Sequence, residues 1–196
     1  MVSGNNWRVF CAIELPAGAS ERATAHINHL RRQFPDIRAS WNREGKFHLT
    51  LKFIGEMAQT RVKSLSLAAE RATRNLQAIN LIVEGAGVFP NHGPPKVLWL
   101  GIKDPSGQLA ELQTRLEEEC AREGFNKEQR VFHPHLTIAR LRKPNGVREL
   151  AAAHKESGFE AVDISVSELL VIRSELSSKG SKYTTISRHP LGPQLT

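Results

Sequence analysis

Two copies of the tripeptide His-Leu-Thr, each inside a short apolar run, constrain the fold of this chain more than any other feature. The copies stand at residues 48–50 and 135–137. Around the first copy, apolar and polar residues alternate from Phe47 to Phe53, a pattern that predicts a half-buried β-strand. Such a repeat predicts a duplicated fold in which the two copies meet across a pseudo-twofold axis.

The alternation places the histidine and the threonine of each copy on the same exposed strand face. In the first copy, the residues predicted to face the core are Phe47, Leu49, Leu51 and Phe53. The residues predicted to face outward are His48, Thr50 and Lys52. In the second copy, His135 and Thr137 share one face, and Leu136 and Ile138 take the other.

The composition is that of a globular protein, with 196 residues of which 40% are hydrophobic and 24% are charged. The 27 basic and 20 acidic residues give a net charge of +7, which favours phosphates, nucleotides or nucleic acid as partners. No linker rich in glycine or serine divides the chain. We therefore expect residues 1–196 to form a single catalytic domain of two similar lobes, each offering one His-x-Thr strand to a central groove.

The cysteines and the first residues of the chain indicate the cellular compartment of the protein. Cys11 and Cys120 fall in a predicted strand and on the apolar side of a predicted helix, which indicates small buried hydrophobic residues. Residues 1–6 lack the order of a signal peptide, and no apolar run approaches the ~20 residues of a membrane helix. We expect a cytoplasmic monomer with no membrane attachment and no obligate protein partner.

Hydrophobic periodicity and turn residues predict several strands with interspersed helices. Besides the second motif strand, strands are expected at residues 8–15, 37–41, 46–54, 79–88, 97–102, 160–164, 168–176 and 182–188. Helices are expected from a cap at Ser20 and Glu21 to Pro35, and at residues 62–76, 109–120 and 147–155. Turns are expected at residues 143–146 and 177–181, and an irregular tail from residue 189. The short turns indicate an α+β fold rather than a doubly wound parallel sheet.

Two imidazoles and two hydroxyl groups at one groove can cleave a phosphodiester. One histidine can take a proton from water while the other gives a proton to the leaving oxygen. Threonine hydroxyls can hold the phosphoryl oxygens, where negative charge builds in the transition state. A five-membered cyclic phosphate is already strained, so such a site could open it without a metal ion.

Basic residues near the two motifs could bind the phosphate. Candidates are Lys52, Arg140 and Arg142. By strand parity Arg140 points away from His135, so its role requires a twist or a bulge. Trp41, Phe53 and Phe89 could stack on a base or belong to the core.

A metal site is the competing interpretation of the motif histidines. His133, His135 and His48 could bind zinc, but no cysteine or carboxylate accompanies them in the motifs and threonine is a poor zinc ligand. We therefore expect no metal and no cofactor. The chain also lacks a phosphate-binding glycine loop, a dinucleotide fingerprint and a serine nucleophile elbow.

Five ordered segments carry a resemblance to a known family: residues 8–16, 47–56, 97–101, 132–140, and Ser174-Glu-Leu with Gly180 and Tyr183. The chain resembles the two-histidine (2H) phosphoesterase superfamily, and within it the RNA 2′,3′-cyclic phosphodiesterases, also described as 2′-5′ RNA ligases. The resemblance implies a bilobal, pseudo-twofold α+β fold. In that fold, antiparallel sheets flank a central groove and helices lie outside.

The resemblance also implies an activity, the metal-independent hydrolysis of an RNA-terminal 2′,3′-cyclic phosphate to a 2′-phosphate. It makes His48 the proton donor and His135 the proton acceptor, with Thr50, Thr137 and Arg140 binding the substrate. A non-catalytic module that binds nucleotides or RNA ends, or a 2′-5′ RNA ligase or phosphodiesterase, is the alternative. Partners would be RNA 3′ ends or cyclic-phosphate nucleotides, and tRNA halves, small cyclic nucleotides and 2′-5′ oligonucleotides remain open as substrates.

Overall fold

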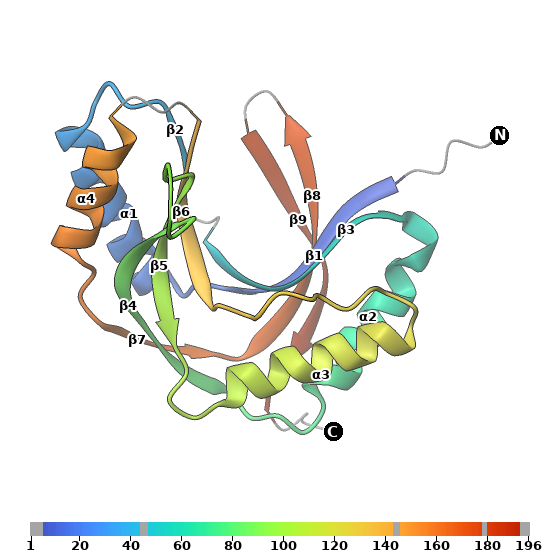
Figure 1. Ribbon diagram of the computed structural model, residues 1–196. Coiled ribbons are helices and arrows are strands. Elements are labelled where there is room, and N and C mark those ends of the chain that lie inside the picture. The colour runs from blue at the N-terminus through green and yellow to red at the C-terminus, as the bar shows by residue number, and fades with distance from the viewer. Residues whose placement is uncertain (1–5, 44–46, 143–145, 178–179, 193–196) are drawn as a thin grey trace.

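Two antiparallel β-sheets with helices on their outer sides make up the described part of the chain (Figure 1). The computed structural model describes residues 6–43, 47–142, 146–177 and 180–192, so the turns predicted at residues 143–146 and 177–181 lie partly outside it. The first sheet holds, in spatial order, β3 (His48–Ala58), β1 (Asn6–Glu14), β8 (Glu168–Ser177) and β9 (Gly180–Pro190). The second holds β2 (Ala39–Trp41), β6 (His135–Leu141), β5 (Val97–Lys103), β4 (Ile79–Phe89) and β7 (Val162–Val166). The α+β class with antiparallel sheets is confirmed.

The helices cover the two sheets in pairs. They are α1 (Ala17–Gln33), α2 (Val62–Thr73), α3 (Gln108–Arg122) and α4 (Val147–Ser157), with a 3-10 turn at Gln59–Arg61. Helices α2 and α3 pack on each other and against the first sheet, whereas α4 packs against α1 and β4 of the second sheet (Figure 1). A continuous hydrophobic core joins the helices to the sheets. Among the described residues, none of the helices combines the length and the apolar character needed to span a membrane.

Several predicted boundaries were wrong: β3 continues to Ala58, α2 ends at Thr73, and β7 spans Val162–Val166. Two further errors have a local reason. Helix α1 begins at Ala17 rather than after the predicted cap at Ser20, because Pro16 precedes the helix with φ of −57° and its carbonyl accepts the Ser20 N–H at 2.9 Å. Ser20 itself is buried inside the helix. Strand β9 continues through His189 to Pro190 in register with β8, so the irregular tail starts later than predicted.

Strand β3 carries one extra residue directly after the threonine of its motif. In the pairing with β1, Ala12 lies opposite Thr50 and Cys11 lies opposite Lys52, which leaves Leu51 without a partner. This is a β-bulge, and it reverses the in-and-out alternation of Lys52 and Phe53, before a second register shift makes Ile54 another extra residue.

The bulge overturns two of the predicted side-chain orientations in β3. Phe47, Leu49 and Leu51 are buried as predicted. Lys52, predicted to face outward, is 4% exposed, and Phe53, predicted to face the core, is 49% exposed. The alternation failed there because Leu51 and Lys52 both point inward across the bulge.

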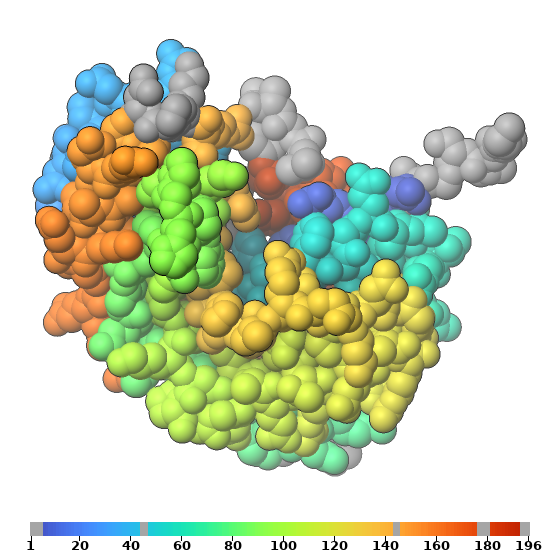
Figure 2. Space-filling view, in the orientation of Figure 1, coloured from blue at the N-terminus to red at the C-terminus, as the bar shows by residue number. Residues whose placement is uncertain are grey.

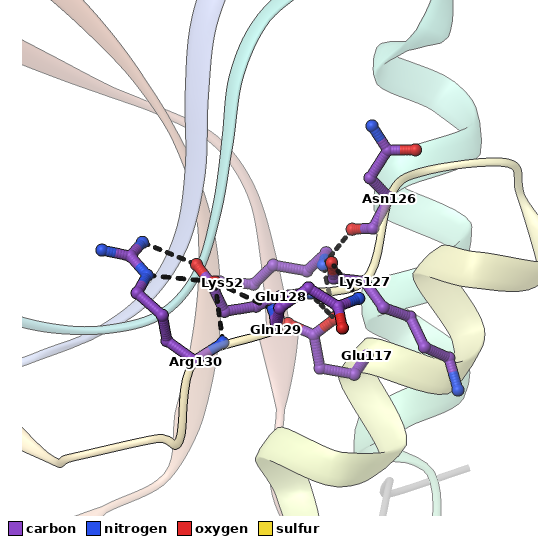
Figure 3. A network of polar contacts seen from close by, with 7 residues as sticks. All are labelled: Lys52, Glu117, Asn126, Lys127, Glu128, Gln129 and Arg130. Atoms are coloured by element: carbon purple, nitrogen blue, oxygen red, sulfur yellow. Dashed lines mark hydrogen bonds and ion pairs between the residues drawn. The ribbon is translucent and has the colours of Figure 1, made fainter.

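Lys52 therefore stabilises the interior instead of binding a phosphate (Figure 3). Its ammonium group donates to Glu117 Oε2 on α3 at 2.6 Å and to the carbonyl oxygen of Asn126 at 2.8 Å. The same carboxylate oxygen accepts the backbone N–H of Glu128 at 3.1 Å. These bonds hold the segment that leads into the second motif strand, so a residue of the first motif strand fixes the approach to the second.

Trp99 on β5 lies flat against Gly87 on β4. The two residues are opposite each other in the sheet, and a Cβ atom added at Gly87 would lie 2.1 Å from the indole ring. Phe89 also packs on the indole, with 5.2 Å between ring centroids. The missing side chain at Gly87 thus makes room for an aromatic cluster on the inner face of the second sheet.

The two cysteines are buried free thiols, as predicted. Burial raises the pKa of Cys11 well above its usual value and that of Cys120 to about 12. Both thiols therefore stay protonated at neutral pH and act as small core residues.

Replacing Lys52 by methionine should lower the free energy of unfolding by about 3–5 kcal/mol, because the Glu117 carboxylate would stay buried without its counter-ion. Urea unfolding followed by circular dichroism measures this loss. Lys103→Met is the matched control, because Lys103 pairs with Glu84 at 2.7 Å but its side chain is 62% exposed. The control should cost less than about 1 kcal/mol. Equal losses in both variants would contradict a special role for the buried pair.

Substituting Gly87→Ala should destabilise the protein by about 1–3 kcal/mol, because the new methyl group must displace the Trp99 ring. Thermal unfolding and the tryptophan fluorescence spectrum of the folded state report the two effects. Gly18→Ala on α1 meets no atom within 4 Å and serves as the control, with stability unchanged or slightly raised. An unchanged indole spectrum in Gly87→Ala would argue against the close packing.

Candidate active site

Strand β6 repeats the bulge of β3 at the equivalent position. Opposite β5, Trp99 pairs with Thr137 and Leu98 pairs with Ala139, so Ile138 is the extra residue. Arg140 lies opposite Val97, which is on the same side of β5 as Trp99. A role for Arg140 beside His135 required a twist or a bulge in this strand, and the bulge is present. It places Arg140 on the strand face that carries Thr137.

The ring of His135 is fixed by a hydrogen bond and by aromatic neighbours. Its Nδ1 lies 2.6 Å from the carbonyl oxygen of His133. Because a carbonyl oxygen can only accept, Nδ1 carries the proton, and the neutral ring has its electron pair on Nε2. Phe89 and Trp99 pack edge-on against the imidazole, with centroids 5.0 Å and 6.3 Å away.

The surroundings of His135 favour the neutral imidazole. Burial lowers the pKa of His135 below its usual value, and the positive charge of Arg140 lowers it further. The hydrogen bond to the His133 carbonyl opposes these effects. At neutral pH the ring is thus a base with Nε2 as the proton-accepting atom.

His48 at the start of β3 has a matching aromatic environment. The ring of Phe10 on β1 lies 4.8 Å from the imidazole, and the ring of Tyr183 on β9 meets it edge-on at 5.0 Å. Phe10 and Tyr183 also contact each other at 5.5 Å. Each motif histidine is therefore held between two aromatic rings, supplied in both cases by strands of its own sheet.

The two motif strands lie next to each other, and a groove begins beside the second strand at Thr137 and Arg140. His48, Thr50 and His135 are not among the lining residues of this groove. Strands β3 and β6 are in contact although they belong to different sheets. The groove has a volume of about 1150 Å³, and Thr137, Arg140 and Tyr183 are among its lining residues. Because Tyr183 also contacts His48, one side chain connects the first motif to the wall formed by the second. Figure 2 shows another hollow, between the loop after β4, the segment before β6 and strands β1 and β3, and these segments contribute no lining residue to the groove.

The remaining sequence candidates lie in different places. Trp41 and Arg142 line the groove, and Phe89 packs on His135 rather than in the core. Phe53 is exposed, and the guanidinium carbon of Arg8 lies 4.6 Å from its ring centroid. Lys52 is excluded from the groove by its ion pair with Glu117.

Sequence reasoning missed the aromatic residues that hold the two imidazoles. Phe10 belongs to the run Val9–Phe10–Cys11–Ala12–Ile13, whose unbroken apolar character indicates burial on both strand faces, and this was the available signal. Trp99 and Tyr183 lie on strands far from their histidines in the sequence. No spacing in the sequence predicts that these residues contact the histidines.

A metal centre finds no support in the side chains near the groove. Within the described ranges, no three His, Cys, Asp or Glu side chains form a group that could hold a metal ion. His133 is exposed, and its carbonyl rather than its ring contacts His135.

Comparison with known proteins adds evidence independent of this geometry. Residues 15–177 match the family model of the 2′-5′ RNA ligase superfamily. The RNA 2′,3′-cyclic phosphodiesterase of Escherichia coli strain K12 is 31% identical over 185 residues, which cover 94% of this chain and 96% of that protein. The RNA 2′,3′-cyclic phosphodiesterase of Methanothermobacter thermautotrophicus is 30% identical over 178 residues, covering 90% of this chain and 95% of that protein.

A solved structure agrees with the sequence match. The crystal structure of E. coli LigT complexed with 3′-AMP superimposes with a TM-score of 0.74 at 28% identity, covering 96% of this chain and 100% of that chain. The fold predicted from the resemblance is thereby confirmed. With a His-x-Thr strand in each of two facing sheets and a family match over residues 15–177, this chain belongs to the 2′-5′ RNA ligase superfamily of 2H phosphoesterases.

Proposed function

We propose that this protein hydrolyses the 2′,3′-cyclic phosphate at the 3′ end of an RNA to a 2′-phosphate, by acid–base catalysis from two histidines without a metal ion. The observation that carries the proposal is the orientation of His135, whose Nδ1–H is committed to the His133 carbonyl so that Nε2 is a base. Relatives named RNA 2′,3′-cyclic phosphodiesterase, about 30% identical over most of the chain, support the same reaction.

In the proposed reaction, Nε2 of His135 takes a proton from a water molecule as the water oxygen attacks phosphorus. The bond between phosphorus and the 3′ oxygen breaks, and His48 gives its proton to that oxygen. The products are a 3′ hydroxyl and a 2′-phosphate. His135 then releases its proton to solvent and His48 regains one, which restores the starting state.

Thr50 and Thr137 are proposed to hold the phosphoryl oxygens while charge builds on them. Each threonine lies two residues after its histidine on the same strand face. Arg140 shares the face of Thr137 because of the bulge, and its guanidinium can stabilise the negative charge of the phosphate.

The domain organisation is part of the proposal. The two sheets repeat one spatial order, with β3, β1, β8 and β9 matching β6, β5, β4 and β7, which supports two similar lobes in one catalytic domain. Each lobe supplies one His-x-Thr strand. A monomer that acts in the cytoplasm stays a prediction from the sequence.

The reaction is tested with an oligoribonucleotide that ends in a 2′,3′-cyclic phosphate, incubated with the protein in excess EDTA. We expect the ring to open to a 2′-phosphate, and we expect His48→Ala and His135→Ala each to lower the rate by about 10²–10⁴-fold. Product separation by chromatography measures this loss.

His29→Ala is the control for these two substitutions, because His29 is exposed on α1 and outside the groove lining. Its rate should equal that of the unmodified protein. Full activity in His48→Ala and His135→Ala would refute the assigned roles, and tight nucleotide binding without any product would favour a binding module. Activity abolished by EDTA and restored by a divalent ion would refute metal independence.

Arg140 should also control the pH dependence. Its positive charge lowers the pKa of His135, so Arg140→Gln should raise that pKa and move the acidic limb of kcat/KM to higher pH. Rates measured from about pH 5 to 9 locate the limb. Arg142→Gln, two residues farther along the chain, should leave the limb in place. An unmoved limb in Arg140→Gln would contradict the coupling.

A further inference from the structure

A pair of histidines joins the two helices that cover the second sheet (Figure 1). Nε2 of His26 on α1 lies 2.9 Å from Nδ1 of His154 on α4, and Nε2 of His154 lies 3.1 Å from the carbonyl oxygen of Trp99 on β5. His154 is fully buried, and His26 is partly buried. The proposed reaction uses neither residue of this pair.

The Trp99 carbonyl determines the direction of both hydrogen bonds. A carbonyl oxygen only accepts, so Nε2 of His154 carries a proton, and Nδ1 of the neutral ring is the acceptor for the N–H of His26. Burial lowers the pKa of His26 to about 4, and burial also lowers the pKa of His154 below its usual value. Both rings are therefore neutral at neutral pH, and every donor along the pair meets an acceptor.

The backbone that His154 contacts carries an aromatic neighbour of His135. Trp99 lies opposite Gly87 on β4, and hydrogen bonding to the backbone of both residues opposes the effect of burial on the pKa of His154. The indole lies against Gly87 and meets the imidazole of His135 edge-on, with 6.3 Å between ring centroids. A shift of this backbone would therefore move the indole and expose His135 to water.

Trp99 also lies at the irregular part of the second motif strand. It pairs with Thr137 on β6, directly beside the extra residue Ile138. At a bulge the ladder of strand hydrogen bonds is interrupted, so backbone groups there need other partners. An apolar side chain at position 154 could also pack α4 on the sheet, but it would leave the Trp99 carbonyl without the donor that His154 supplies.

We propose that His154, held in one tautomer by His26, is a positioning residue for the base of the reaction, because it fixes the Trp99 backbone and thereby the orientation and the enclosure of His135. The inference rests on the proposed function, since it takes His135 as the base. His154 acts on His135 through Trp99.

The test compares His154→Leu, which removes both hydrogen bonds, with His154→Gln, whose amide can donate to the Trp99 carbonyl and accept from His26. Proton–carbon NMR spectra recorded from about pH 5 to 9 follow the titration of the His135 imidazole without any substrate. The His135 signal is identified by its loss in His135→Ala. In His154→Leu we expect the pKa of His135 to rise toward its ordinary value, because the displaced indole no longer shields the ring from water.

The same variants should separate in the rate of ring opening on an oligoribonucleotide that ends in a 2′,3′-cyclic phosphate. We expect His154→Leu to lower kcat about 10–100-fold with KM nearly unchanged, because a misplaced base weakens the transition state and not the binding of the substrate. His154→Gln should restore most of kcat and the original pKa of His135.

His189→Leu is the matched control for the loss of a buried, hydrogen-bonded histidine. Nε2 of His189 lies 2.8 Å from Ser187 Oγ, and both residues stand on β9 of the first sheet. This variant should lower the stability of the fold and leave the pKa of His135 and kcat unchanged.

His26→Phe is a second variant that applies if His154→Leu does not fold. It keeps an aromatic ring beside Phe159, which His26 meets edge-on at 5.7 Å, and removes only the donor to His154. It should change the pKa of His135 and kcat in the same direction as His154→Leu.

An unchanged pKa of His135 or an unchanged kcat in His154→Leu would overturn the inference. Equal effects in His189→Leu, or no recovery in His154→Gln, would also overturn it, because the histidine would then serve only the packing of the fold. If the unmodified protein does not open the cyclic phosphate, the proposed function fails, while the NMR titration still decides whether His154 controls His135.

Discussion

One extra residue after each motif threonine is the constraint on which the rest of the site depends. Leu51 and Ile138 are the unmatched residues after the two threonines, and each reverses the facing of the two residues that follow it. In β6 the reversal turns Arg140 toward Thr137. In β3 the same reversal turns Lys52 away from solvent into the interior. Without its bulge, β6 would turn Arg140 away from Thr137, and β3 would turn Lys52 outward onto the face of His48 and Thr50.

The buried lysine also makes the two motif strands interdependent. Its ion pair with Glu117 belongs to the packing of α3 on the first sheet, and the bond to the Asn126 carbonyl fixes the segment that enters β6. The aromatic pairs around His48 and His135 act over shorter distances, since each restricts the rotation of one ring. Packing sets the orientation of the rings, and the His133 carbonyl then determines which nitrogen of His135 is the base.

The sequence predicted the strands, the helices and the two His-x-Thr motifs, because hydrophobic periodicity and turn residues are local signals. The predicted orientations of Lys52 and Phe53 were wrong, because a β-bulge can be recognised only when the partner strand and its register are known. It also could not find Tyr183 beside His48, because strand order in a sheet is a tertiary property. The groove beside the second motif strand could not be predicted for the same reason, because its lining residues come from α1, β2 and β6, which are distant in the chain.

The positions that follow the two bulges are equivalent in the strands but hold different residues, Arg140 in β6 and Phe53 in β3. One sheet therefore carries a cation where the other carries an aromatic ring. The pseudo-twofold relation between the sheets does not extend to these side chains. The scaffold thus combines a repeated strand order with unlike side chains at matching positions, so its two sheets present different chemistry.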